Sequence, residues 1–206
     1  MISLGLTGGI GMGKTAAAEI LARGGLPVVD TDQLARDLVV PGQPALEEIR
    51  DAFGPEVLAL DGSLDRKVLA QRIFREVPAR QQLEAILHPR IRAAWRERFD
   101  AWSRAGEGLA VVVIPLLFEV GAEAELDVTV CVACSTATQR QRLLARGWLD
   151  EQIAARLAAQ WPAEKKLARA RYGVWNEGGL DSLTAQLSRI LGSLDCACRQ
   201  PGQMRI

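Results

Sequence analysis

A chain of 206 residues with 49% hydrophobic and 24% charged residues has the composition of a globular protein, either one large domain or a core domain with insertions. Its 25 basic residues balance 25 acidic ones, which argues against a basic field that would recruit nucleic acid or an anionic membrane. No apolar run reaches the length of a bilayer span, and no charged leader precedes the first apolar run. We therefore expect a cytoplasmic protein with no nucleic-acid and no membrane partner.

The first predicted strand, 2–6, leads into a glycine-rich loop and then into a helix expected at 16–23. Residues 8–15 read GGIGMGKT and fit the phosphate-loop pattern G-x-x-x-x-G-K-[ST]. In this geometry backbone N–H groups and the helix dipole converge on a phosphate, Lys14 reaches the outer phosphates, and the Thr15 hydroxyl can ligate Mg²⁺. The alternative, a glycine-rich turn that binds nothing, is disfavoured because a strand and a helix flank the loop.

A second chemical signal is a pair of carboxylates, Asp30 and Asp32, at the end of a strand expected at 27–30. Residues i and i+2 of an extended segment point the same way, and the carboxyl ends of parallel strands face the ligand crevice. At least one of the two should therefore face the phosphates. Alternatively, one of them caps the helix expected at 33–40. Both can hold, with one carboxylate capping and the other accepting a hydroxyl proton or holding Mg²⁺.

The interval between Asp32 and Gly108 is too long for a simple crossover and is mostly helical in pattern. It predicts an all-helical insertion packed beside the sheet. We expect helices at 43–53, 64–75, 78–87 and 89–103, with a break at His88-Pro89 between the last two.

The third predicted strand, 109–114, runs into a segment whose first carboxylate is Glu119. Many phosphate-loop ATPases place an Asp directly after such a strand to hold Mg²⁺. Its absence argues against a motor or switch ATPase and favours a small kinase. The base-reading Asn/Thr-Lys-x-Asp motif of GTPases is also absent from the sequence.

A fourth strand, expected at 127–133, carries the spacing Cys131-x-x-Cys134. The chain has no second C-x-x-C motif, and its single histidine is His88. We therefore interpret both cysteines as small core residues rather than as metal ligands or a redox pair. The tail at 195–206, with Cys196 and Cys198, is expected to be weakly structured.

A second insertion, 136–171, follows the fourth strand. It predicts helices at 136–146, 150–160 and 162–171, with Asp150 capping the second. Its basic residues suit either a solvated helix surface or a lid that closes over a nucleotide. They are Arg140, Arg142, Arg146, Arg156, Lys165, Lys166, Arg169 and Arg171.

With a fifth strand at 172–175, strands and helices alternate along the chain. This alternation predicts an α/β fold: a phosphate-loop-type parallel sheet of five strands with helices on both faces. The helical insertion and the helical lid complete the expected architecture.

Several blocks of the sequence, in this order and spacing, resemble the dephospho-coenzyme A kinase family. The resemblance extends from about residue 2 to about residue 194. The phosphate loop alone is common to very many proteins, whereas the Asp-x-Asp, His-Pro and Pro-Leu-Leu-x-Glu blocks together are specific. The blocks are 5–15 (GLTGGIGMGKT), 29–36 (VDTDQLAR), 87–89 (LHP), 114–119 (IPLLFE), Gln139-x-x-Arg142-x-x-x-Arg146, 160–165 (QWPAEK) and 176–178 (NEG).

The resemblance implies transfer of the ATP γ-phosphoryl group to the ribose 3′-hydroxyl of dephospho-coenzyme A, the last step of coenzyme A synthesis. It implies ATP as co-substrate, Mg²⁺ as cofactor, and a monomer or weak homo-oligomer. It also implies one kinase domain in three parts and a tail. These are a core (1–32, 106–135 and 172–194), a helical substrate subdomain (33–105), a lid (136–171) and the tail at 195–206.

The resemblance further implies roles for individual residues. Asp32 is expected to act as a base or to order the metal with Thr15, and the catalytic group comprises Asp32, Lys14, Arg142 and Arg146. The acceptor is expected to meet Asp32, Arg36, His88, Pro89, Leu116, Leu117 and Glu119. ATP is expected to meet Gly9, Ile10, Gly11, Met12, Gly13, Lys14, Thr15, Ala16 and Asn176, with Asn176 near the adenine.

Three alternatives stay open. A nucleoside or nucleotide kinase shares the loop and the lid, although the Asp-Gly-aromatic-Pro-Arg segment of adenylate-type kinases is absent. A nucleotide-sensing module without catalysis would not need the Asp pair or the lid cations. His88 could be a general base, but its place before Pro89 favours a structural or substrate-orienting role.

Overall fold

The structure is a computed structural model that describes the backbone of residues 1–198 and the side chains of residues 1–194. Within it the chain forms two compact units. One unit contains residues 1–28 and the chain from 107 onward, and the other contains residues 29–106.

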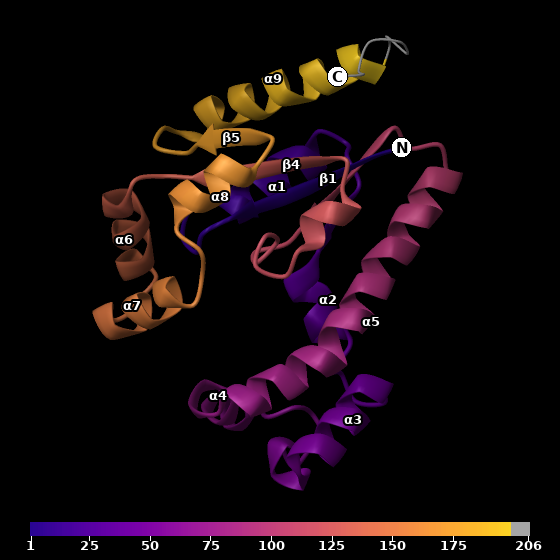
Figure 1. Ribbon diagram of the computed structural model, residues 1–206, viewed down its shortest axis with the longest axis vertical. Helices are drawn as coiled ribbons and strands as arrows, with labels where there is room; N and C mark the ends of the chain where they lie inside the picture. The colour runs from indigo at the N-terminus through magenta and orange to yellow at the C-terminus, as the bar shows by residue number, and fades with distance from the viewer. Residues whose placement is uncertain (199–206) are drawn as a thin grey trace. The chain divides into compact units, whose positions relative to one another are not determined.

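The sheet has five strands in the order β2-β3-β1-β4-β5. Its central strand β1 (Ile2–Gly8) pairs in parallel with β3 (Leu109–Val113) and with β4 (Val128–Ala133), and β4 pairs in parallel with β5 (Tyr172–Trp175). β1, β4 and β5 lie side by side (Figure 1). With β2 (Val28–Asp30), all five strands occur within two residues of their expected bounds, so the predicted parallel sheet is confirmed.

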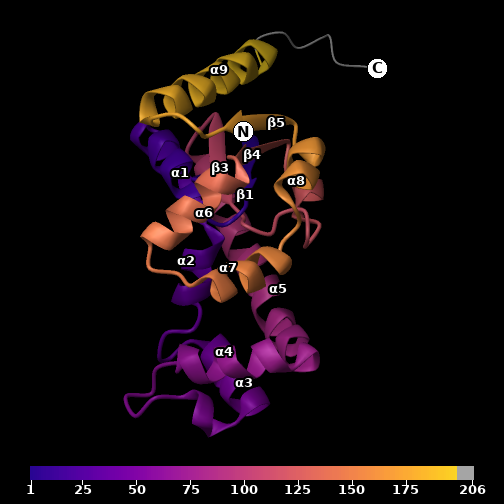
Figure 2. The same cartoon turned by 90° about the vertical axis from the view of Figure 1, so that its left-hand side faces the viewer.

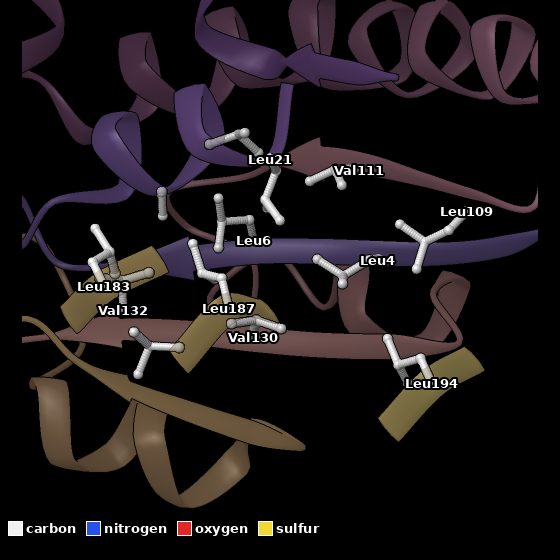
Figure 3. Packing of buried hydrophobic residues seen from close by; sticks show 13 residues of the cluster. Leu4, Leu6, Leu21, Leu109, Val111, Val130, Val132, Leu183, Leu187 and Leu194 are labelled. Atoms are coloured by element: carbon white, nitrogen blue, oxygen red, sulfur yellow. The ribbon is translucent and has the colours of Figure 1, made fainter. Parts of the chain in front are cut away.

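The sheet is apolar because its central strands are covered on both faces, as in α/β proteins generally. Every residue of β3 is buried. On one face Leu4, Leu6 and Val130 pack against helix α1 (Lys14–Arg23) and helix α9 (Leu180–Cys198), as Figure 3 shows. Burying each such side chain stabilises the fold by about 1.5–3 kcal/mol.

Three helices fill the interval between β4 and β5: α6 (Thr136–Ala145), α7 (Asp150–Ala158) and α8 (Ala163–Arg169). They follow one another in Figure 2, and α8 packs against β4. The expected cap at Asp150 is wrong, because the cap residue is Leu149, whose N–H donates to the Gln152 side chain. Asp150 lies one residue later and pairs with Arg140 instead.

The expectation for the tail is wrong in part. Helix α9 continues to Cys198, so the backbone of 195–198 is helical. A stripe of Leu183, Leu187 and Leu194 at helical spacing joins this helix to the core (Figure 3). The side chains of Cys196 and Cys198, and residues 199–206 altogether, lie outside the described residues.

The second unit is helical, as predicted for the insertion. Its helices are α2 (Thr31–Asp37), α3 (Pro44–Phe53), α4 (Arg66–Arg75) and α5 (Val77–Arg104), with short 3₁₀ turns at η1 (Pro55–Val57) here and at η2 (Ala122–Glu125) in the first unit. Both α3 and α4 pack against α5 (Figure 1). Their buried residues form a separate core.

The predicted helix break at His88-Pro89 is wrong, because α5 runs through Pro89. A proline inside a helix removes one backbone hydrogen bond and usually disrupts it. Next to Pro89, the Arg90 guanidinium donates to the Ile86 carbonyl oxygen at 2.7 Å and forms an ion pair with Glu48 of α3. The Arg90–Glu48 pair ties this part of α5 to α3, and the two predicted helices form one.

Candidate functional site

The loop between β1 and α1 depends on glycines for its shape. Gly13, the N-cap of α1, has φ 102°, a left-handed conformation that disfavours other residues. A Cβ at Gly13 would clash with the Asn176 side chain, and one at Gly8 would clash with the Val132 carbonyl oxygen. The glycine pattern thus allows neighbouring segments to close tightly around the loop.

Helix α1 begins at Lys14, so its unpaired N–H groups and positive dipole end follow the loop directly. The first turn of α1 holds no acidic residue, and Thr15 is exposed there. The Lys14 ammonium donates to the carbonyl oxygens of Gly8 (2.7 Å) and Gly9 (3.2 Å), which places a cation over the loop. These features are typical of an anion-binding site, and we call the loop with the first turn of α1 the cradle.

Asn176 and Arg142 complete one side of this cradle. Asn176 is buried, and its side-chain amide donates to the Met12 carbonyl oxygen at 3.0 Å. Arg142 of α6 donates through Nη2 to the Asn176 carbonyl oxygen at 3.0 Å. Its Nη1 is buried and has no hydrogen-bond partner among the described residues, and it lies 3.9 Å from the position of a Cβ on Gly13. A buried donor without a partner is costly, which indicates that an acceptor belongs beside the loop.

Two glutamines hold the peptide groups of Ile10, a residue of the loop. Gln139 of α6 donates to the Ile10 carbonyl oxygen at 2.7 Å, and Gln160, after α7, accepts the Ile10 N–H at 3.1 Å. Both glutamines belong to blocks that carried the family resemblance, but sequence reasoning gave neither a role. Their membership of those blocks was the sequence feature that could have identified them. Contacts between residues so far apart in the chain produce no local sequence pattern.

Glu177 was also missed as a supporting residue. Its carboxylate accepts from the Ser135 N–H and, at 2.6 Å, from the Thr138 hydroxyl, both at the start of α6. A hydrogen bond from the Ser135 side chain, then that from the Thr138 side chain, and then that from the Ser135 N–H hold the pKa of Glu177 below its ordinary value. Glu177 thereby fixes the helix that carries Gln139 and Arg142.

Arg146, the remaining lid arginine expected to be catalytic, is exposed at the C-cap of α6.

Glu119 and Lys166 form a buried ion pair at 2.8 Å. Lys166 is fully buried on α8, so it is wrong to count it among the solvated lid cations. Of the other residues expected to meet the acceptor in this segment, Leu116 is half-buried, and Leu117 is fully buried in the unit's interior.

The cysteines behave as core residues, as predicted. Cys131 and Cys134 are buried free thiols. Burial raises the pKa of Cys131 to about 11 and raises that of Cys134 as well, so both are protonated at neutral pH. Within the described part of the chain no three His, Cys, Asp or Glu residues cluster as a metal cage.

The remaining predicted residues lie in the helical unit. Helix α2 begins at Thr31 rather than at the expected residue 33, because the Asp30 carboxylate caps it by accepting the Asp32 N–H at 2.8 Å. Asp32 is therefore exposed in the first turn of α2, with Arg36 exposed one turn later. His88 and Pro89 are exposed on α5.

The first strand of the parallel sheet leads through the cradle into helix α1, and helix α6 brings Arg142 beside it. This arrangement defines a phosphate-loop kinase. The model of one family, described as dephospho-CoA kinase, matches residues 2–182. The chain belongs to the dephospho-CoA kinase family, whose reaction is ATP-dependent phosphorylation of dephospho-CoA, the final step of CoA biosynthesis. The predicted family and fold are confirmed.

Individual relatives agree. A dephospho-CoA kinase from Anaeromyxobacter dehalogenans is 48% identical over 93% of this chain and 91% of its own. One from Syntrophotalea carbinolica is 44% identical over 94% of this chain and 92% of its own. A crystal structure from Thermus thermophilus superposes with a TM-score of 0.82 at 37% identity, over 94% of this chain and 97% of that one.

A dephospho-CoA kinase structure from Campylobacter jejuni has a TM-score of 0.71 at 25% identity, over 95% of this chain and 98% of that one. Across the described residues, no helix combines the length and apolar character needed to span a membrane.

Proposed function

We propose that this chain transfers the γ-phosphoryl group of Mg·ATP to the ribose 3′-hydroxyl of dephospho-CoA. The observation that carries the proposal is the partnerless Nη1 of Arg142, buried beside Gly13. Together with Lys14 above the loop, it gives the cradle two cations of different geometry. Such a site suits the outer phosphates of a nucleotide, where charge spreads over the transferring group.

The nucleotide half of the site is proposed to act by positioning and electrostatics, which supply nearly all of this chemistry. Backbone N–H groups of the loop and of the first turn of α1 would bind phosphate oxygens. Lys14, Arg142 and Arg146 would stabilise charge on the transferring group. The residues proposed to meet ATP are Gly9, Ile10, Gly11, Met12, Gly13, Lys14, Thr15, Ala16 and Asn176.

Asn176 is hydrogen-bonded to both the loop and Arg142, so its expected contact with the adenine is not its sole role. Its side-chain amide is engaged by the Met12 carbonyl oxygen, and its own carbonyl oxygen is engaged by Arg142. We propose that Asn176 chiefly shapes the loop and orients Arg142. Contact with the adenine stays a prediction from the family resemblance.

Mg²⁺ fits the donors of this chain. It prefers one or two protein oxygen ligands together with phosphate oxygens and water, so it needs no all-protein cage. Thr15 and Asp32 would hold it, and when bound it supplies charge neutralisation between the β- and γ-phosphates.

Asp32 is the residue proposed to serve the acceptor. The Asp30 carboxylate caps α2, and Asp32 is exposed in the first turn of that helix. It would either accept the hydroxyl proton or order Mg²⁺. Arg36, His88, Pro89, Leu116, Leu117 and Glu119 are the residues proposed to bind the acceptor.

We further propose that the moving part of the predicted lid, 136–171, is centred on α7. Helix α6 is bonded to the loop through Gln139, and α8 is bonded to the segment after β3 through its ion pairs with Glu119 and Glu123. Helix α7 has fewer such ties, and its Asp150–Arg140 pair is exposed. We also propose that the protein is a monomer or weak homo-oligomer and that it is cytoplasmic.

The test of the proposed product is the position of the transferred phosphate. Purified protein is incubated with Mg·ATP and dephospho-CoA, and the product is examined by phosphorus and proton NMR. The expected result is a phosphomonoester on the ribose 3′-carbon. A phosphomonoester at any other hydroxyl, or phosphorylation of AMP in preference to dephospho-CoA, would contradict the proposal.

A further inference from the structure

The ion pair of Lys166 and Glu119 joins α8 to the segment that follows β3. The Lys166 ammonium has no exposed surface and donates to the Pro115 carbonyl oxygen at 2.8 Å as well as to Glu119. A lysine removed from water in this way is costly unless its charge is paired and its donors are satisfied. An apolar pair of similar volume often serves stability equally well, so stability alone does not account for the pair.

One connection runs from this pair to the start of the phosphate loop. The Pro115 carbonyl oxygen that accepts from Lys166 also accepts from the Thr7 hydroxyl at 3.2 Å. Thr7 is fully buried in β1 and directly precedes Gly8, the first glycine of the loop. The position of Lys166 is thus coupled to the residue from which the loop departs.

A second connection reaches the middle of the loop. The Glu119 oxygen that pairs with Lys166 also accepts the Trp161 N–H at 2.9 Å. The preceding residue, Gln160, accepts the Ile10 N–H through its side chain. The ion pair therefore holds the short segment 160–161, and that segment holds the loop.

We propose that Lys166 and Glu119, with Gln160, are positioning residues that fix the backbone of the phosphate loop in the geometry that ATP requires. The contacts form a closed ring around the loop: Thr7, Pro115, Lys166, Glu119, Trp161, Gln160 and Ile10. A loop rich in glycine has many accessible conformations, and the ring selects one of them. Small displacements of such a site cost up to about a hundredfold in rate, so the ring bears directly on catalysis.

The chain contains a matched control on the same two segments. Arg169, one turn beyond Lys166 on α8, pairs with Glu123 at 2.6 Å, four residues beyond Glu119. This pair joins the same helix to the same segment, but within the described residues it shares no hydrogen-bond partner with the ring that reaches the phosphate loop. The double variants Lys166→Met/Glu119→Leu and Arg169→Met/Glu123→Leu therefore differ in their connection to the loop.

The first readout is hydrogen exchange at the Ile10 amide, measured by NMR on the folded protein. In Lys166→Met/Glu119→Leu the Ile10 amide should exchange at least about tenfold faster than in the unaltered protein, although neither substitution touches Ile10. In the control double variant it should exchange within about twofold of the unaltered rate, since partly exposed ion pairs contribute little. An unchanged Ile10 rate in the first variant, or equal acceleration in both, overturns the proposal.

The second readout is ATP affinity by calorimetry without the acceptor, which separates loop positioning from the acceptor role proposed for Glu119. Gln160→Leu, which leaves the buried ion pair intact, should fold normally and should weaken ATP binding by about tenfold. Unchanged or tighter ATP binding in Gln160→Leu overturns the proposal, and this variant decides the matter if the double variant fails to fold.

Turnover provides a further measure, and only this part rests on the proposed function. Both altered proteins should lose kcat with dephospho-CoA while the control double variant keeps it. If the unaltered protein showed no acceptor-dependent turnover, the proposed function would fail, while the exchange and affinity measurements would still test the ring.

Discussion

Arg142 lies against Asn176 in an arrangement that leaves one half of its guanidinium unused. Nη2 donates to the Asn176 carbonyl oxygen at 3.0 Å, while Nη1 is buried and has no partner within the described residues. Asn176 in turn holds the Met12 carbonyl oxygen of the phosphate loop. This buried Nη1 lowers the stability of the protein, whereas the same group is proposed to bind phosphate. Function and stability therefore make opposite demands on Arg142.

Arg142→Met should lower turnover by about a hundredfold, because it removes a cation proposed to stabilise the transferring group. Its free energy of unfolding should change by less than about 1 kcal/mol, because loss of the hydrogen bond to the Asn176 carbonyl oxygen is offset by removal of a buried donor that lacks a partner among the described residues. Arg140→Met on the same helix serves as the control, since Arg140 forms an exposed ion pair with Asp150. A large loss of stability in Arg142→Met, with turnover retained, would contradict the assignment.

Substitutions of Asp30 and Asp32 should have different effects on turnover and on stability. Asp32→Asn should reduce turnover by about a hundredfold while ATP binding survives, because the loop backbone is untouched. Asp30→Ala should instead reduce stability by about 1 kcal/mol through loss of the α2 cap, with a smaller effect on turnover. Turnover, ATP affinity and denaturant midpoints measure the three quantities.

Metal titration distinguishes the two roles left open for Asp32. If Asp32 orders the metal, high Mg²⁺ or Mn²⁺ should partly restore Asp32→Asn, whereas the loss of a base should not be restored. Asp30→Asn keeps a capping side chain and is the matched control. Should Asp30→Asn prove much worse than Asp32→Asn, the assignment within the pair is wrong.

Glu177 should make the free energy of unfolding depend on pH in the acidic range. Its pKa is held below the ordinary glutamate value, chiefly by a hydrogen bond from the Ser135 side chain and then by that from the Thr138 side chain, so the folded state favours the ionised form. The stabilisation is complete above the ordinary value and is lost as the pH falls through the depressed one. Glu177→Gln should therefore be less stable at pH 7, and the difference should shrink below about pH 4. Denaturation curves across this range measure it, and a difference that grows in acid would refute the reasoning.

Limited proteolysis tests the proposed movement of α7. Cleavage between residues 146 and 160 should slow when ATP and a non-reacting acceptor analogue are present together, because closure shields the backbone. Cleavage in the loops of the helical unit at 29–106 provides an internal reference. Equal cleavage of 146–160 with and without ligands would favour a static solvated helix.

Local sequence signals were sufficient for the cradle and the sheet. The pattern from Gly8 to Thr15 carries its own geometry, and the apolar runs of β1, β3 and β4 match strands buried on both faces. Helix boundaries were less predictable where side chains decide them. Asp30 moves the start of α2 to Thr31, and α5 continues through Pro89 although a proline usually ends or kinks a helix.

The residues that hold the phosphate loop from other parts of the chain could not be predicted from local sequence patterns. Gln139 and Gln160 meet Ile10 across separations of 129 and 150 residues, and no periodicity reports such contacts. Lys166 lies in a basic segment that suits a solvated surface, yet its ammonium is buried against Glu119. Only the folded arrangement distinguishes this lysine from its neighbours.

Lys14 provides a strong test of the nucleotide half. Lys14→Ala should lower turnover by at least about a thousandfold, since a cation over the loop stabilises the transferring phosphoryl group. Lys14→Arg should also be poor, because a planar guanidinium does not fit a cradle shaped around an ammonium. An alanine variant with near-normal turnover would contradict the proposed role of this lysine.

The most direct test of the central claim is acceptor-dependent ADP release. A coupled assay with purified protein and Mg·ATP should show release that rises strongly when dephospho-CoA is added. Adenosine, AMP and shikimate, added separately at the same concentration, should give little above the ATP-only background. Release driven by AMP or shikimate but not by dephospho-CoA would contradict the account.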